Sequence, residues 1–174
     1  MHTKGIFLDR DGVLNRAIVR DGKPYPPQTP KEVEILPGVE EACSRLALAG
    51  YALVLVTNQP DLARGATPRE WVDSVNDRLR DVLHLDLVMV CPHSDEDRCA
   101  CRKPAPGMLL EAATMLDLDL SRSFMVGDRW KDVEAGRNAG CRTIWIRSGY
   151  QERSGADADF SAPGLLEAAG WILA

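Results

Sequence analysis

Two aspartates stand directly after a short apolar segment near the start of the chain. Residues 6–8 are Ile, Phe and Leu, and Asp9, Arg10, Asp11 and Gly12 follow them. Side chains two apart on an extended chain point to the same side, so both carboxylates would project into one space. Like charges held together are costly unless a cation lies between them or one takes up a proton. The pattern predicts a divalent-cation site with acid–base chemistry, and the alternative is a solvated turn without activity.

More polar side chains follow the other apolar segments, and with the aspartates they form a set suited to one reaction. The residues concerned are Thr57, Asn58, Gln59, Arg102, Lys103, Asp128, Arg129 and Asp132. In phosphoryl transfer through an aspartyl phosphate, one carboxylate attacks phosphorus while oxygen ligands hold Mg²⁺. A lysine and a hydroxyl, here Lys103 and Thr57, bind the phosphoryl oxygens. The residue types therefore predict a magnesium-dependent phosphatase.

Five short apolar segments alternate with amphipathic segments along the chain. We expect strands buried on both faces over residues 6–8, 52–56, 87–90, 124–126 and 143–146. We expect helices over residues 38–49, 68–83, 106–116, 130–139 and 164–172, and a flap or extended loop over residues 24–27. Such alternation predicts an α/β fold, a Rossmann-like three-layer domain with a central parallel sheet. The polar residues would then gather at the carboxyl edge of that sheet.

The same polar residues fall into four motifs that resemble those of the haloacid dehalogenase (HAD) superfamily of phosphatases. They read DRDGVLN from residue 9, VTNQ from residue 56, RKPAPG from residue 102 and GDRWKD from residue 127. The specific likeness is to the branch that contains heptose-bisphosphate and histidinol-phosphate phosphatases. It covers nearly the whole chain, in order and at sensible spacings.

This resemblance implies a role for each motif. Asp9 would be the nucleophile, and Asp11 the general acid and then the base. Asp9, Asp128 and the backbone carbonyl of Asp11 would bind Mg²⁺, with Asp132 supporting the ion through water. The nucleophile must stay ionised, whereas Asp11 must gain and lose a proton, so contact with the metal suits Asp9 and not the side chain of Asp11. The residues implied to bind substrate are Thr57, Asn58, Gln59, Arg102, Lys103 and Arg129.

Four further residues could hold a second metal ion. Cys91, His93, Cys99 and Cys101 lie within eleven residues, and the members of each pair are two apart. Four such ligands with none to spare are typical of a closed, structural zinc site. The alternatives are reduced thiols beside a surface histidine, or a disulfide. Because Lys103 follows the last ligand closely, zinc would fix the backbone that presents this lysine to phosphate.

The composition sets limits on the class of protein. The 174 residues are 45% apolar and 27% charged, which suits one soluble domain over residues 1–174 with a zinc loop over residues 91–101. The net charge of −5 argues against a nucleic-acid partner, which would need a basic stripe. We see no apolar run long enough to cross a membrane and no signal peptide, so we expect a cytoplasmic protein, acting as a monomer.

The connections between the motifs are too short for the cap domain of larger HAD members, so we expect a capless, open site. The resemblance implies a sugar-bisphosphate substrate, in the first place a heptose 1,7-bisphosphate that loses its 7-phosphate. The alternatives are histidinol phosphate or another small sugar phosphate and, in a different class, a zinc-stabilised binding module without catalysis. Pro60 and Asp61 depart from the Ser-Gly of the heptose enzymes, because proline removes a backbone donor and Asp61 adds a negative charge.

Overall fold

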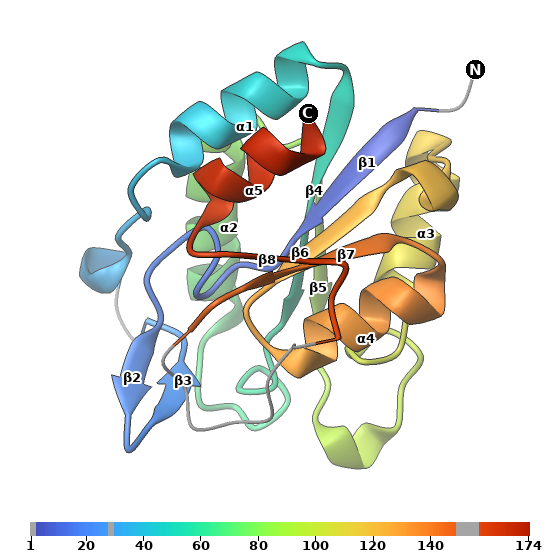
Figure 1. Ribbon diagram of the computed structural model, residues 1–174. Coiled ribbons are helices and arrows are strands. Elements are labelled where there is room, and N and C mark those ends of the chain that lie inside the picture. Colours follow the sequence, from blue (N-terminus) through green and yellow to red (C-terminus); the bar gives the residue numbers. More distant parts are fainter. Residues whose placement is uncertain (1–2, 28–29, 149–156) are drawn as a thin grey trace.

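Six parallel strands form the central sheet of the protein. The computed structural model describes residues 3–27, 30–148 and 157–174. The strand order is β5-β4-β1-β6-β7-β8 (Figure 1). The strands are β1 (Lys4–Leu8), β4 (Tyr51–Asn58), β5 (Leu87–Cys91), β6 (Phe124–Gly127), β7 (Arg142–Ile146) and β8 (Phe160–Ala162). The five predicted strands are confirmed and slightly longer than expected, while β8, with three residues, is an addition.

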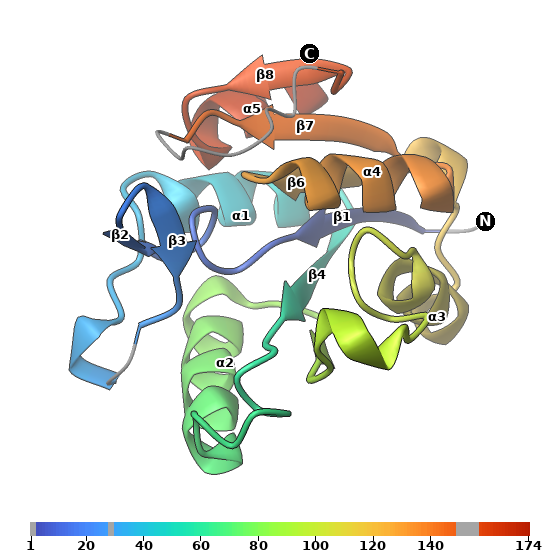
Figure 2. The ribbon, with the colours of Figure 1, turned by 90° about the horizontal axis from the view of Figure 1, so that it is seen from below.

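Five helices cover the two faces of this sheet and complete the predicted three-layer α/β fold. Helices α1 (Val39–Leu48), α2 (Arg69–Leu83) and α5 (Leu165–Ile172) lie on one face, and α3 (Gly107–Leu116) and α4 (Trp130–Ala139) lie on the other (Figure 2). Each helix begins and ends within one residue of its predicted bounds.

Alternate residues of the central strands supply the two cores. Ile6 and Leu8 of β1 belong to the cluster beneath α1, α2 and α5, whereas Phe7 belongs to the cluster beneath α3 and α4. Successive side chains of a strand point to opposite faces, so a strand covered by helices on both sides must be apolar throughout. The expectation of burial on both faces is wrong for β5, where Leu87 to Val90 are half-buried, because β5 is an edge strand.

A small antiparallel hairpin, β2 (Ile18–Arg20) and β3 (Lys23–Tyr25), follows β1. Asp21 and Gly22 form its turn with φ values of 50° and 72°, the left-handed pair that favours tight hairpins. The flap or loop expected over residues 24–27 is therefore partly a strand. A short 3₁₀ helix (Pro30–Glu32) completes the connection, and we find no separate cap unit in the parts of the chain that the structure describes. Across the same residues, none of the helices has the length and apolarity needed to cross a bilayer.

Candidate active site

A cavity of about 220 Å³ lies at the carboxyl ends of the central strands. The chain runs from β1 to β4 on one side of β1 and later returns to β6 on its other side, so the end of β1 is a switch point where ligands bind in such sheets. Residues from all four predicted motifs line the cavity: Asp9, Asp11, Thr57, Asn58, Lys103, Arg129 and Asp132. The hairpin contributes Pro24 and Tyr25 to one wall.

A buried lysine joins two aspartates at the floor of this cavity. The Nζ of Lys103 lies 2.7 Å from Oδ1 of Asp9 and 2.7 Å from Oδ1 of Asp132, and it donates to the Val56 carbonyl oxygen at 2.8 Å. Lys103 is 3% exposed, Asp9 8% and Asp132 2%. Buried charges of this kind persist when they are paired and hydrogen-bonded.

The surroundings of these groups change their proton affinities. Burial, together with the negative charge of Asp132, raises the pKa of Asp9 to about 6, although Lys103 acts in the opposite direction. Burial alone would lower the pKa of Lys103, but Asp132 and Asp9 outweigh it and raise that pKa above its usual value. Lys103 therefore stays positively charged, while Asp9 binds a proton more tightly than an ordinary aspartate does.

The carboxylate of Asp11 also lines the cavity but points toward a different set of donors. It accepts hydrogen bonds from Asn15 Nδ2 at 3.0 Å and Gln59 Nε2 at 3.1 Å, and Arg10 Nη2 lies 3.1 Å from its Oδ2. The two aspartates of the first motif are thus held separately, one against Lys103 and the other against donors from Arg10, Asn15 and Gln59. The roles expected for the two carboxylates, nucleophile for Asp9 and acid–base group for Asp11, stay predictions.

Arg10 is a residue whose place the sequence did not reveal. Its side chain is fully buried, and Nη1 donates to Oδ1 of Asn76 in α2 at 3.0 Å. The motifs assign no role to Arg10, and the pattern of α2 does not distinguish Asn76 from its neighbours. The one available signal was that a buried strand leads directly into Arg10.

The second motif supplies supports as well as cavity walls. Thr57 is 1% exposed and lines the cavity, and its hydroxyl accepts from Gln59 Nε2 at 2.9 Å. Asn58 clamps the backbone of Lys103: its Nδ2 donates to the Lys103 carbonyl, and its Oδ1 accepts from the Lys103 amide, both at 3.1 Å. Gln59 is 3% exposed and lies behind the cavity wall, so its contact with substrate remains a prediction.

The fourth motif depends on a glycine. A Cβ on Gly127 would collide with the side chain of Asp132, so only glycine lets Asp132 pack against the end of β6. The Arg129 amide donates to Oδ2 of Asp132 at 3.0 Å, which caps the first turn of α4 and leaves Oδ1 for Lys103. Asp132 therefore contacts Lys103 directly, whereas the sequence suggested only a contact with Mg²⁺ through water.

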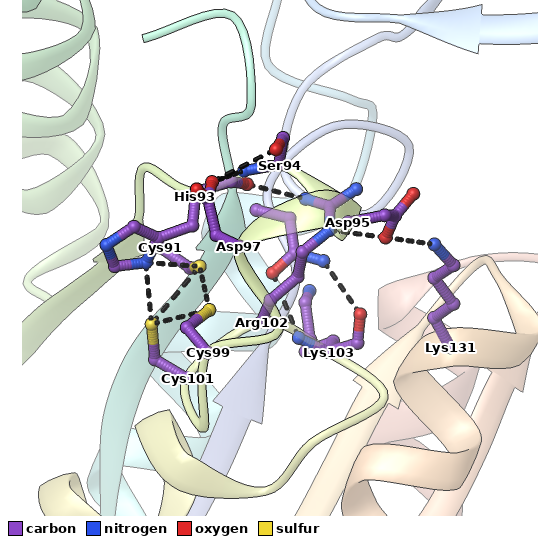
Figure 3. A network of polar contacts seen from close by, with 11 residues as sticks. Cys91, His93, Ser94, Asp95, Asp97, Cys99, Cys101, Arg102, Lys103 and Lys131 are labelled. Atoms are coloured by element: carbon purple, nitrogen blue, oxygen red, sulfur yellow. Dashed lines mark hydrogen bonds and ion pairs between the residues drawn. The ribbon is translucent and has the colours of Figure 1, made fainter. Parts of the chain in front are cut away.

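The four candidate zinc ligands gather at one point (Figure 3). Their sulfur and Nδ1 atoms lie 3.2 to 3.7 Å apart in the five pairs Cys91–His93, Cys91–Cys99, Cys91–Cys101, His93–Cys101 and Cys99–Cys101. A tetrahedral ion with Zn–S bonds of about 2.3 Å places its ligand atoms about 3.8 Å apart, so the cluster has the size that one zinc ion needs. The cysteines are free, and the disulfide alternative is not what the structure shows.

The thiols of this cluster differ in proton affinity, because burial raises the pKa of Cys91 and of Cys101 above the ordinary value. Burial opposes ionisation of Cys99, yet hydrogen bonds from Cys101 and the Arg102 backbone lower the pKa of the Cys99 thiol to about 7. The thiolate is the form that binds a metal. The arrangement therefore supports zinc on the chemistry of its donors.

Comparison with known proteins gives the family. A family model described as HAD-hydrolase-like matches residues 100–168. D-glycero-β-D-manno-heptose-1,7-bisphosphate 7-phosphatases from Bordetella bronchiseptica and Pasteurella multocida are 38% and 40% identical over 151 and 161 residues. These alignments cover 84% of this chain in both cases and 82% and 83% of the relatives. The chain belongs to the HAD superfamily of phosphatases.

Solved HAD structures agree with this assignment. A crystal structure of the B. bronchiseptica D,D-heptose 1,7-bisphosphate phosphatase, complexed with magnesium and phosphate, superimposes with a TM-score of 0.84. It is 34% identical and covers 98% of each chain. A crystal structure of a HAD-like phosphatase from Mesorhizobium loti gives a TM-score of 0.74 at 30% identity, over 98% of this chain and 88% of the other. The predicted superfamily is therefore confirmed.

In this HAD phosphatase, three carboxylates could hold the magnesium ion. Asp9, Asp128 and Asp132 are all buried, and each offers an oxygen within 4.8 Å of the others. Carboxylate oxygens are the ligands that Mg²⁺ prefers, and Lys103 supplies one positive charge to three aspartates. A divalent cation would offset the remaining charge, so the residues fit the ion.

Arg102 is not among the residues that line the cavity. Its Nε lies 2.7 Å from Oδ1 of Asp95, and its Nη1 donates to the His93 carbonyl at 3.2 Å (Figure 3). The cations at the cavity rim are instead Arg64, Arg129 and Lys131. The predicted contact between Arg102 and substrate stays a prediction, and Lys131 is a rim residue to which the motifs assign no role.

Proposed function

We propose that this enzyme hydrolyses the 7-phosphate of D-glycero-D-manno-heptose 1,7-bisphosphate through a phosphorylated Asp9. The observation that carries the proposal is the buried Asp9–Lys103–Asp132 network beside Asp128, at the switch point of a HAD fold. Relatives at 35–40% identity are named as heptose-1,7-bisphosphate 7-phosphatases, which supports this choice of substrate.

The chain's own residues divide the reaction between them. A carboxylate oxygen of Asp9 attacks phosphorus, and the bond from phosphorus to the sugar oxygen breaks. Asp11 gives a proton to that leaving oxygen and then takes one from the water that attacks the aspartyl phosphate, which restores Asp9. Lys103 and Thr57 hold the phosphoryl oxygens, and Asn58 and Arg129, which line the cavity, make further substrate contacts. Contacts from Gln59 and Arg102, whose side chains are engaged with other residues in the structure, stay predictions from the motifs.

Both metal ions belong to the proposal. Asp9, Asp128 and the backbone carbonyl of Asp11 would hold Mg²⁺, with Asp132 in support. When bound there, Mg²⁺ would neutralise charge on the phosphoryl oxygens. The zinc ion would be structural, held by Cys91, His93, Cys99 and Cys101. It would tether the segment that ends in Lys103, since Asn58 clamps the backbone of that residue from the other side.

We further propose that the enzyme is a single-domain, cytoplasmic monomer without nucleic-acid or membrane partners. The free cysteines of the zinc cluster support a reducing compartment such as the cytoplasm, because they must stay reduced to act as ligands.

A phosphate-release screen tests the substrate. The protein is assayed in Mg²⁺ with heptose 1,7-bisphosphate, heptose 7-phosphate, histidinol phosphate and other sugar phosphates. We expect the highest kcat/KM for the heptose bisphosphate, with heptose 1-phosphate as the product. A clear preference for histidinol phosphate would contradict the proposed substrate. If no phosphomonoester released phosphate, the proposal that the protein is a phosphatase would be wrong.

A further inference from the structure

Three charged residues join the cysteine–histidine loop to the first turn of α4. We call Asp95, Arg102 and Lys131 the bridging cluster. Oδ1 of Asp95 lies 2.7 Å from Arg102 Nε and 3.2 Å from Lys131 Nζ (Figure 3). The two cations share one carboxylate oxygen, so the bridging cluster keeps a net positive charge at the edge of the cavity.

Lys131 occupies a position where a cation is unfavourable without an anion. It is the second residue of α4, where the helix dipole places partial positive charge. Its side chain is 20% exposed and lines the same cavity as Asp9 and Lys103. This geometry calls for a negative group at the Lys131 ammonium, and Asp95 supplies one from the loop.

The loop holds the Asp95 carboxylate in a defined place. The Ser94 amide and hydroxyl donate to Oδ2 of Asp97 at 2.7 and 3.0 Å, which closes the turn around Asp95. Arg102 completes the arrangement by its bond to the His93 carbonyl. Asp95 therefore presents its charge to Lys131 from a short, internally bonded turn.

The Asp95–Lys131 contact is also exchangeable. The Asp95 side chain is 69% exposed, and ion pairs that face water contribute little net stability. A phosphate group carries more charge and three acceptor oxygens, so it makes stronger charge-assisted bonds to an ammonium group. An anion that enters the cavity can replace Asp95 as the partner of Lys131 at a small cost in free energy.

We propose that Lys131 receives the second anionic group of a bisphosphate substrate, and that Asp95 is the positioning residue that holds Lys131 at the rim for it. This inference rests on the proposed function and adds to it the source of selectivity for a bisphosphate. One phosphate lies against Asp9 and Lys103 at the cavity floor, and the other lies at Lys131.

The test compares two substrates that differ by one phosphate. We define discrimination as kcat/KM for heptose 1,7-bisphosphate divided by kcat/KM for heptose 7-phosphate. Replacing Lys131 by Met should lower discrimination about tenfold, because one charge-assisted contact to the second phosphate is lost. Asp95→Asn should lower it about threefold, the scale of an exposed ion pair. The control is Glu96→Gln, which removes an exposed carboxylate from the same turn and should leave discrimination as in the wild type.

A double variant separates positioning from a general charge effect. Asp95→Asn added to Lys131→Met should cause no further loss, because Asp95 acts through Lys131. An equal loss from Asp95→Asn in both backgrounds, a gain in discrimination from Asp95→Asn alone, or unchanged discrimination in Lys131→Met would overturn the inference. The proposed function fails separately, if the wild-type enzyme releases phosphate from neither substrate.

Discussion

At the residue scale, the charge on Asp9 works against the stability of the metal-free fold. The folded pKa of about 6 lies above the ordinary value of 3.8, so the folded state binds the proton more tightly than the unfolded chain. A carboxylate raised in this way contributes its full stability below pH 3.8 and loses it as the pH rises through about 6. Functional carboxylates commonly carry such a cost.

This sign gives a prediction for Asp9→Asn, which removes the titration. In the absence of metal, wild type should lose up to about 3 kcal/mol relative to the variant between pH 4 and pH 7, since each pKa unit is worth about 1.4 kcal/mol. Urea unfolding at both pH values in a chelating buffer measures the difference. Added Mg²⁺ should shrink it by binding the ionised carboxylate, and a difference that does not vary with pH would contradict the account.

The same scale shows what sequence can predict about a site. Asp9, Asp11, Lys103 and Asp128 could be found because their types and spacing match one chemistry. The direction of Arg102 could not, because it is decided by Asp95, a residue that no motif marks. The burial of Arg10 could not be predicted either, because its partner Asn76 lies 66 residues away in the sequence and belongs to no motif.

At the scale of elements, β6 and α4 must approach closely for Asp132 to reach Lys103. Gly127→Ala inserts a methyl group where Asp132 stands, so we expect kcat/KM to fall at least tenfold, on the order of the 1.4 kcal/mol that equals a tenfold change in rate. The control is Gly170→Ala in α5, where a Cβ meets open space and a helical alanine stabilises by up to about 1 kcal/mol. Steady-state kinetics on both variants decide the matter, and equal activities would contradict the role given to Gly127.

The loop between β5 and α3 gives a second prediction at this scale. Cys101→Ser should lower bound zinc, measured by elemental analysis, and reduce kcat/KM about tenfold or more, as losses in a supporting metal shell do. The helical circular dichroism should stay near that of wild type, because Cys101 only borders the core beneath α3 and α4, whose buried members come mostly from the strands and helices. Cys141→Ala removes a thiol outside the cluster and should retain zinc. Full activity in zinc-free Cys101→Ser would show that the loop does not position Lys103.

Elements were predictable where periodicity is strong. Five helices and five strands follow from apolar patterning, since each must cover or cross one buried sheet. The short strand β8 and the hairpin strand β3 carry too few residues for a period to emerge, and Pro24 within β3 reads as a loop. Half-burial of β5 depends on its place at the sheet edge, which sequence order alone does not give.

At the scale of the whole molecule, one sheet supports both apolar cores. The cluster beneath α1, α2 and α5 and the cluster beneath α3 and α4 share strands β1, β4 and β6. Loss of either core would uncover the sheet that the other needs, so we predict one cooperative unfolding transition for the metal-loaded protein. Tryptophan fluorescence and far-ultraviolet circular dichroism should give coincident urea curves. Two separated transitions would contradict the proposal of a single domain.

The whole account depends on Asp9 taking up a phosphoryl group covalently. Rapid acid quench of the enzyme during turnover, followed by peptide mass spectrometry, measures this directly. The account predicts a phosphorylated peptide that maps to Asp9 in wild type and is absent from Asp9→Asn. Turnover without any phosphorylated peptide, or with phosphate on another residue, would contradict it.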